Sequence, residues 1–167
     1  STTGKTSREI FEIREKRKQG HHQDFLMVGS MGCALPTGLA IKLNTPKKVY
    51  VIDGDGAVLM KMGALTTAGS YAGAGFVHIL IDNGAYESTG GQCTSSIVVD
   101  WKKLFQSVGY KDIILIENQA KLSQIKLSSL KSPAAIIVKV VPGSRKDLGR
   151  PTTTPVQNRD AFTAFVK

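Results

Sequence analysis

A β-branched run that ends in a glycine-flanked carboxylate restricts the possible folds of this sequence more than any other feature. Residues 49–52 have the composition of a strand buried on both faces, and Gly54-Asp55-Gly56 follows almost at once. A second strand-like run, residues 76–81, ends just before Asn83. Because α/β sheets bind ligands at the carboxyl ends of their strands, Asp55 and Asn83 are expected to meet at neighbouring strand ends.

Strand-like and helix-like segments alternate along the whole chain. This alternation predicts an α/β fold, with a mostly parallel sheet and helices on both faces. A length of 167 residues, 41% of them hydrophobic, fits one domain that spans residues 1–167. The expected strands are residues 25–28, 48–53, 76–81, 113–116 and 134–141, and the expected helices are residues 7–18, 33–43, 59–72, 101–108, 118–130 and 157–166.

The residue types at the two strand ends suit a hard cation. A carboxylate, an amide oxygen and a backbone carbonyl are typical ligands of Mg²⁺ or Ca²⁺, and a sparse Mg²⁺ site takes further ligands from water and phosphates. The alternative is a simple tight turn, since Asp and Gly both favour turns. A third motif, Gly29-Ser30-Met31-Gly32, precedes a small apolar helical run and favours a ligand site, although Met31 could also be a gap-filling core residue.

Together, Gly54-Asp55-Gly56, Asn83 and the Gly-x-Met-Gly segment resemble the cofactor motifs of thiamine diphosphate-dependent decarboxylases. The resemblance implies the thiamine diphosphate-binding fold, with thiamine diphosphate and Mg²⁺ as cofactors. It implies that Asp55, Asn83 and the backbone carbonyl of Ala85 hold the metal. The family motif usually has Asn-Asn where this chain has Asp82-Asn83, but the position of the metal ligand is preserved.

The same resemblance implies roles around the organic part of the cofactor. Met31 would wedge between its two rings, and the carbonyl of Gly29 would accept a hydrogen bond from the aminopyrimidine; these two are the residues with an expected catalytic role. Gln92 is a further candidate for the cofactor or substrate pocket. The other expected cofactor-binding residues are Thr3, Gly4, Ser30, Gly54, Gly56, Ala57 and Tyr86.

Segments at both ends of the chain, above all residues 143–155, are similar to the phosphonopyruvate decarboxylase branch of this family. That similarity implies conversion of 3-phosphonopyruvate, a small anionic 2-oxo acid, to phosphonoacetaldehyde and carbon dioxide. A sulfopyruvate decarboxylase of the beta-subunit type is the alternative. In the family an activating Glu comes from a separate pyrimidine-binding domain, which this chain lacks. We therefore expect half of an enzyme, inactive alone, working with a pyrimidine-binding domain or subunit and assembling as a homo-oligomer. A start at Ser1 without an initiator Met favours a fragment over a small subunit.

The formal charge of +9 also allows a basic α/β module that binds a nucleotide or nucleic acid. The densest basic run, residues 14–18, belongs to an expected amphipathic helix, and aromatic residues do not interleave with it, so no nucleic-acid partner is expected. A Rossmann dinucleotide site is disfavoured because Leu59 stands where the pattern requires Gly or Ala. No run of about 18 apolar residues and no signal-peptide pattern occurs, so a cytoplasmic protein without membrane contact is expected.

Several remaining residues have two possible interpretations. His21 could approach the active site or lie in a solvated loop, whereas His78, inside an apolar run, is expected to be a hydrogen-bonded core residue. Arg145 and Arg150 belong to the segment 143–155 that carries the family similarity, but they could also be surface charges on a Pro-rich loop that fixes the last helix. The two cysteines, Cys33 and Cys93, are expected to be free thiols.

Overall fold

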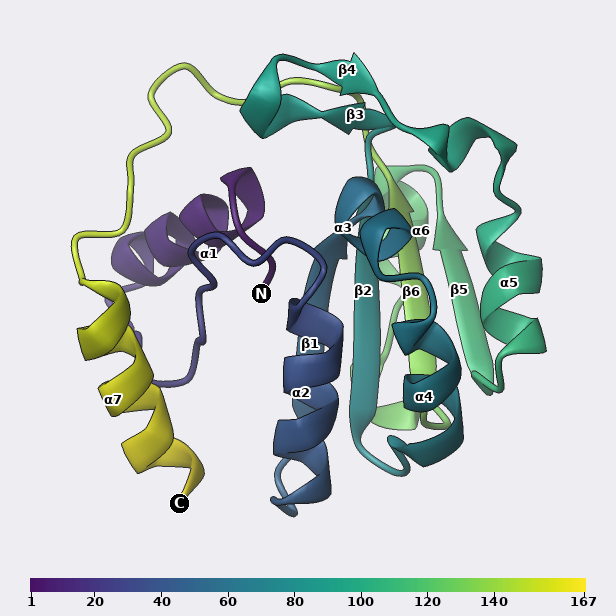
Figure 1. Ribbon diagram of the computed structural model, residues 1–167, viewed down its shortest axis with the longest axis horizontal. Coiled ribbons are helices and arrows are strands. Elements are labelled where there is room, and N and C mark those ends of the chain that lie inside the picture. The colour runs from purple at the N-terminus through teal and green to yellow at the C-terminus, as the bar shows by residue number, and fades with distance from the viewer.

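A four-stranded parallel sheet forms the centre of the protein, which is described here by a computed structural model of residues 1–167 (Figure 1). The strands are β1 (Val49–Gly54), β2 (Phe76–Asp82), β5 (Asp112–Ile116) and β6 (Ala134–Lys139), and their order in the sheet is β1-β2-β6-β5. The predicted fold class is therefore confirmed. Apolar β-branched residues dominate these strands because both faces of a parallel sheet are covered.

The register of the sheet brings the chain segments of the two predicted motifs to one edge. Gly54 at the end of β1 lies opposite Ile81 of β2, so these two strands end almost side by side. On the other side of β2, Asp82 lies opposite Lys139 of β6. The carboxyl ends of three strands therefore meet at the edge drawn at the top of Figure 1.

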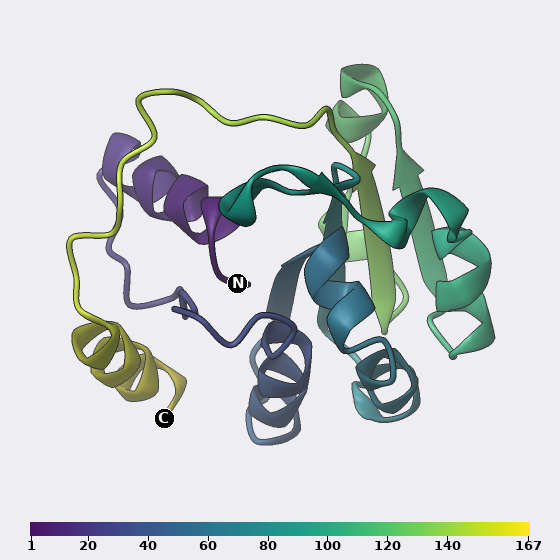
Figure 2. The same ribbon diagram turned by 45° about the horizontal axis from the view of Figure 1, so that its top comes forward.

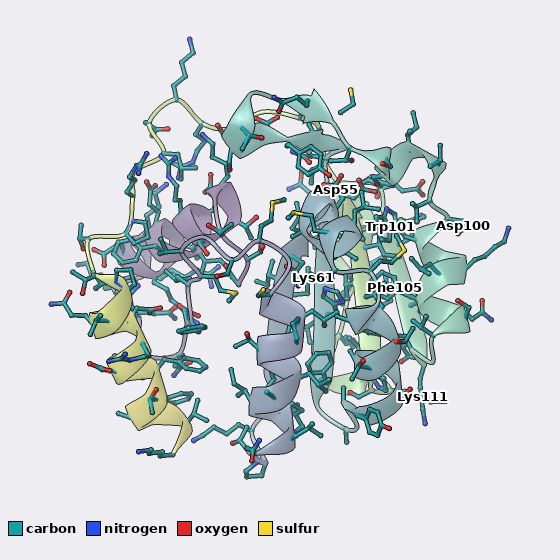
Figure 3. The ribbon with its side chains drawn as sticks, viewed as in Figure 1. Asp55, Lys61, Asp100, Trp101, Phe105 and Lys111 are labelled. Carbon is teal, nitrogen blue, oxygen red and sulfur yellow. The ribbon has the colours of Figure 1, made fainter.

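The main core lies between the sheet and the helices α2 (Ala34–Leu43), α4 (Ala64–Tyr71) and α5 (Trp101–Ser107). Trp101 and Phe105 extend from α5 toward the strands (Figure 3). A smaller apolar cluster lies on the opposite face of the sheet. Residues on either side of the 3-10 helix η3 (Leu127–Ser129), which follows α6 (Gln119–Ser123), pack against it. That cluster is built on Val77, Ile116, Ala134 and Ile136.

Helices α1 (Lys5–Lys16) and α7 (Pro155–Val166) lie beside the sheet next to β1. Residues 140–154 connect β6 to α7 and arch past α1 (Figure 2). Arg145 in this connection forms ion pairs with Glu9 and Glu12 of α1, at 3.1 and 2.5 Å. Contacts between residues more than 130 positions apart thus hold both ends of the chain together.

Three predicted elements are absent, divided or much shorter than expected. Residues 25–28 form no strand, because their backbone bonds elsewhere: the N–H of Leu26 donates to Oδ1 of Asn158, and the N–H of Met27 donates to the carbonyl of Ser1. The helix expected at 59–72 is two helices, α3 (Asp55–Met60) and α4, separated by a turn at residues 61–63 that includes Gly63. The helix expected at 118–130 is shortened to α6 and η3.

A small hairpin at the carboxyl edge was not predicted. It consists of β3 (Ala85–Tyr86), the 3-10 helix η1 (Glu87–Thr89) and β4 (Gln92–Cys93), and the 3-10 helix η2 (Ser95–Val98) follows it. Strands of two residues are too short to show any periodicity in the sequence. The hairpin lies over the start of α3 in Figure 1 and covers one side of the predicted site.

Other expectations concern the core, the cysteines and the membrane. His78 is fully buried between β1 and the residues after α5, as predicted, and both cysteines are free. None of the helices combines the length and the apolar character needed to cross a lipid bilayer.

Candidate functional site

A cavity of about 620 Å³ opens at the carboxyl edge of the sheet. It is enclosed by the ends of β1 and β2, the start of α3, the hairpin, the start of α1 and residues 140–144. Most of the residues predicted to bind the cofactor line this one cavity. They are Thr3, Met31, Gly54, Asp55, Gly56, Ala57, Asn83, Ala85 and Tyr86.

Asp55 is the first residue of α3, and only 1% of it is exposed (Figure 3). Its Oδ2 accepts a hydrogen bond from the hydroxyl of Thr94, and no cationic side chain contacts it. Burial raises the pKa of Asp55, and the neighbouring negative charge of Asp82 raises it further, while the Thr94 hydroxyl partly offsets both effects. A buried carboxylate without a positive partner is costly, and a bound cation would remove that cost.

Asn83 follows β2 directly and lines the same cavity. Its Oδ1 accepts a hydrogen bond from the backbone N–H of Ala85 at 3.1 Å, which fixes the turn that leads into the hairpin. The amide oxygen retains a second lone pair for a ligand. Asp55 and Asn83 therefore line one cavity from the ends of two adjacent strands.

Gly56, Met31 and Tyr86 meet at the floor of the cavity. A side-chain carbon at position 56 would lie 2.3 Å from the ring of Tyr86 and 3.1 Å from the terminal methyl of Met31. Only glycine fits there, because the ring of Tyr86 packs directly against the buried backbone of Gly56. Met31 itself follows Ser30, which has a positive φ of 51°.

A second polar network joins the hairpin to the sheet beside Asn83. Asp82 is buried and accepts hydrogen bonds from the hydroxyl of Ser96, at 2.7 Å, and from the ammonium of Lys139. The indole N–H of Trp101 donates to the same Ser96 oxygen at 2.8 Å. Thr94 and Ser96, which the sequence did not single out, thus attach the hairpin exit to Asp55 and Asp82.

Five predicted residues lie outside the cavity lining. The N–H of Gly29 donates to the hydroxyl of Thr3 at 3.1 Å, so the Gly-x-Met-Gly segment is attached to the rim. The ring of His21 stacks on Phe11 with 4.0 Å between centroids and contacts Glu15, away from the cavity. The others are Gly4, Ser30 and the exposed Gln92.

The two arginines of the loop that fixes the last helix differ in their contacts. Arg145 forms ion pairs with Glu9 and Glu12 of α1, which raise the pKa of its guanidinium. Arg150 is exposed and contacts no acidic side chain.

Comparison with known proteins places these features in a family. Residues 2–139 match the model of the thiamine pyrophosphate enzyme C-terminal TPP-binding domain. The chain belongs to this family. A phosphonopyruvate decarboxylase of Streptomyces viridochromogenes is 40% identical over 99% of the chain, and a sulfopyruvate decarboxylase subunit beta of Methanothermobacter thermautotrophicus is 34% identical over 84%. The predicted resemblance to thiamine-dependent decarboxylases is therefore confirmed.

The relatives differ in how much of their own length the chain matches. It spans only 41% of the Streptomyces viridochromogenes protein, but 72% of the Methanothermobacter subunit and 86% of a sulfopyruvate decarboxylase subunit beta of Methanococcus maripaludis, to which it is 31% identical. Among solved structures, one of a Mycobacterium smegmatis protein described as a thiamin diphosphate-dependent enzyme matches 69% of this chain. The match covers 23% of that protein's chain, with a TM-score of 0.56 and 20% identity. That likeness supports the fold.

Proposed function

We propose that this chain is the diphosphate-binding half of a decarboxylase that converts 3-phosphonopyruvate to phosphonoacetaldehyde and carbon dioxide. One observation carries the proposal: a fully buried carboxylate without a cationic partner, Asp55, lines a cavity together with Asn83. The family match supplies the cofactor class, thiamine diphosphate. The relatives that cover nearly the whole chain are named decarboxylases of phosphonopyruvate or sulfopyruvate.

The donors in the cavity fit a Mg²⁺ ion. Asp55 and Asn83 offer hard oxygen ligands, and the carbonyl of Ala85, which also lines the cavity, would supply a third. Mg²⁺ keeps several positions for water and phosphate oxygens, so a site with few protein ligands suits a phosphate-bearing cofactor. A divalent ion would also compensate the buried charge of Asp55.

Thiamine diphosphate, when bound, supplies the carbon nucleophile and the electron sink for decarboxylation. The chain's own contribution is binding and orientation. Gly54, Gly56 and Ala57, which line the cavity, would bind the diphosphate, and Met31 would set the bend between the two rings. Gly29 would position the aminopyrimidine through its carbonyl.

We propose that a pyrimidine-binding domain or subunit completes the enzyme and that this chain alone does not turn over 2-oxo acids. Relatives named as beta subunits support a second component, as does the small share of the Streptomyces proteins that the chain spans. The phosphonate substrate is preferred over the sulfonate because the phosphonopyruvate decarboxylases are 40% and 38% identical over 99% of the chain, whereas the sulfopyruvate decarboxylase subunit that covers 98% of it is 31% identical.

Calorimetric titration of the chain with thiamine diphosphate, with and without Mg²⁺, tests the cofactor assignment. Binding is expected only when Mg²⁺ is present. An equal affinity for thiamine diphosphate in the presence of a metal chelator would contradict the assignment of a metal-dependent cofactor site. Release of carbon dioxide from 3-phosphonopyruvate is expected only after the pyrimidine-binding component is added, and turnover by the chain alone would contradict the division of roles.

A further inference from the structure

The charged side chains that line the cavity are not equivalent. They comprise three carboxylates, on Glu9, Asp55 and Glu87, and one cation, Lys5. Lys5 is the first residue of α1 and is half-buried. Each of the three carboxylates has a hydrogen-bond or ion-pair partner within the protein. The ammonium of Lys5 has none, and it is the only charged group of the lining without one.

The partner of Glu9 explains why Lys5 is unpaired. Residues four positions apart on a helix usually meet, so Lys5 and Glu9 would be expected to form an ion pair. Instead, both carboxylate oxygens of Glu9 accept hydrogen bonds from the guanidinium of Arg145, each at 3.1 Å. The ion pair between Arg145 and Glu9 thus neutralises Glu9 and leaves the ammonium of Lys5 without a partner.

Several hydroxyl groups line the same cavity as this free cation. Gly4 holds the start of α1 against the hairpin, since a side-chain carbon at that position would lie 2.6 Å from Oγ of Ser88. Ser88, Thr6 and Ser144 all line the cavity, and their hydroxyls make no hydrogen bond within the protein. An ammonium group with several free hydroxyl donors is the chemistry that binds a tetrahedral oxyanion.

We propose that Lys5, with the hydroxyls of Thr6 and Ser88, binds the phosphonate or sulfonate group of the substrate. The inference rests on the proposed function and adds a specificity residue to it. Two charged residues of the lining would then have different ligands: Asp55 would take the metal-bound diphosphate, and Lys5 would take the acid group of the 2-oxo acid. A substrate without that acid group would leave the charge of Lys5 unused.

The test measures binding of the unreactive probe 3-phosphonopropionate to the enzyme saturated with thiamine diphosphate and Mg²⁺. Lys5→Met is expected to weaken binding of the probe by about 10- to 100-fold, the usual effect of losing a charge-assisted hydrogen bond. Its affinity for thiamine diphosphate should stay within about threefold of the wild type. Lys5→Arg should restore most of the probe affinity. Lys16→Met, which removes an exposed lysine from the other end of α1, is the matched control and should change neither affinity.

Two results would overturn the inference alone. Unchanged binding of the probe by Lys5→Met would show that the lysine does not hold the acid group. A loss of thiamine diphosphate affinity as large as the loss of probe affinity would assign Lys5 to the cofactor's diphosphate instead. Failure of the wild-type protein to bind thiamine diphosphate at all would overturn the proposed function, and this inference with it.

Discussion

Two carboxylates on the same segment, Asp53 and Asp55, have opposite surroundings although each is only 1% exposed. Asp53 lies within the sheet, where its Oδ2 is 3.3 Å from Nε2 of His78, and Tyr110 approaches the other nitrogen of that imidazole. Asp55 lies just beyond the strand end and has only the hydroxyl of Thr94. One acid thus lies beside an imidazole inside the core, and the other lines the cavity with only a hydroxyl partner.

The difference indicates how the chain separates stability from binding. A buried acid with an imidazole beside it contributes to a fixed core, although the second oxygen of Asp53 has no hydrogen-bond partner. A buried acid without a cation destabilises the ligand-free protein, and binding of a cation there raises the free energy of unfolding the most. Substitutions around Asp53 should therefore change mainly the stability of the protein, and substitutions around Asp55 should change mainly the binding of the cofactor.

The largest effect on stability is expected at the core pair. His78→Leu should lower the free energy of unfolding by about 3 kcal/mol, because it leaves Asp53 buried without its partner. For a domain of this size that corresponds to a fall in Tm of about 10 °C. Thermal unfolding followed by circular dichroism would measure it. The double variant Asp53→Leu/His78→Leu should recover most of the loss, and a His78→Leu protein as stable as the wild type would remove the contrast.

The largest effect on binding is expected at the strand end. Asp55→Asn should weaken Mg²⁺-dependent binding of thiamine diphosphate by about 100-fold, because a charged metal ligand is lost. The same change should raise the Tm of the ligand-free protein by about 2–4 °C, since an uncompensated buried charge is removed. Calorimetry and thermal unfolding measure the two effects. A variant that binds like the wild type, or that is clearly less stable without ligand, would contradict the assignment.

The pH dependence of stability should show the same contrast. Burial raises the pKa of Asp55 above its ordinary value of 3.8, so the unfolded chain loses this proton at a lower pH than the folded protein. Stability contributed by the protonated group is complete below that value and is lost as the pH rises through the folded-state pKa. The stability advantage of Asp55→Asn over the ligand-free wild type should therefore be absent near pH 3 and present at neutral pH. A difference that does not change with pH would contradict this.

The smallest effect is expected at the hairpin contact. Thr94→Val removes the hydroxyl that donates to Asp55 and should weaken Mg²⁺-dependent cofactor binding by about fivefold, the value of one hydrogen bond of about 1 kcal/mol. Thr66→Val, at an exposed position on α4, is the matched control and should leave binding unchanged. Equal affinity in both variants would show that the hairpin does not support Asp55.

The sequence predicted the position of Asp55 and Asn83 because regular features place both residues. A buried strand followed by Gly54-Asp55-Gly56 and a second strand ending at Asn83 are local patterns, and parallel pairing then brings their ends to one edge. His78 was predicted to be buried for a similar reason, because it interrupts an apolar run that only a core strand explains.

The elements that escaped prediction depend on contacts between distant residues. The hairpin has strands of two residues, and its anchor, Thr94, is recognised only once Asp55 is known to lie beneath it. The sequence left open whether Arg145 is a plain surface charge, and the structure shows that it pairs with Glu9 across 136 positions. The unpaired state of Lys5 follows from that pairing and is not visible in any local pattern.

The most direct test of the account is a crystal structure of the protein with thiamine diphosphate and Mn²⁺ in place of Mg²⁺, with the metal located by its anomalous scattering. The account predicts one metal ion within about 2.3 Å of an oxygen of Asp55 and of Oδ1 of Asn83, and bridged to the diphosphate. A metal ion bound elsewhere, or a diphosphate bound without either side chain, would contradict it.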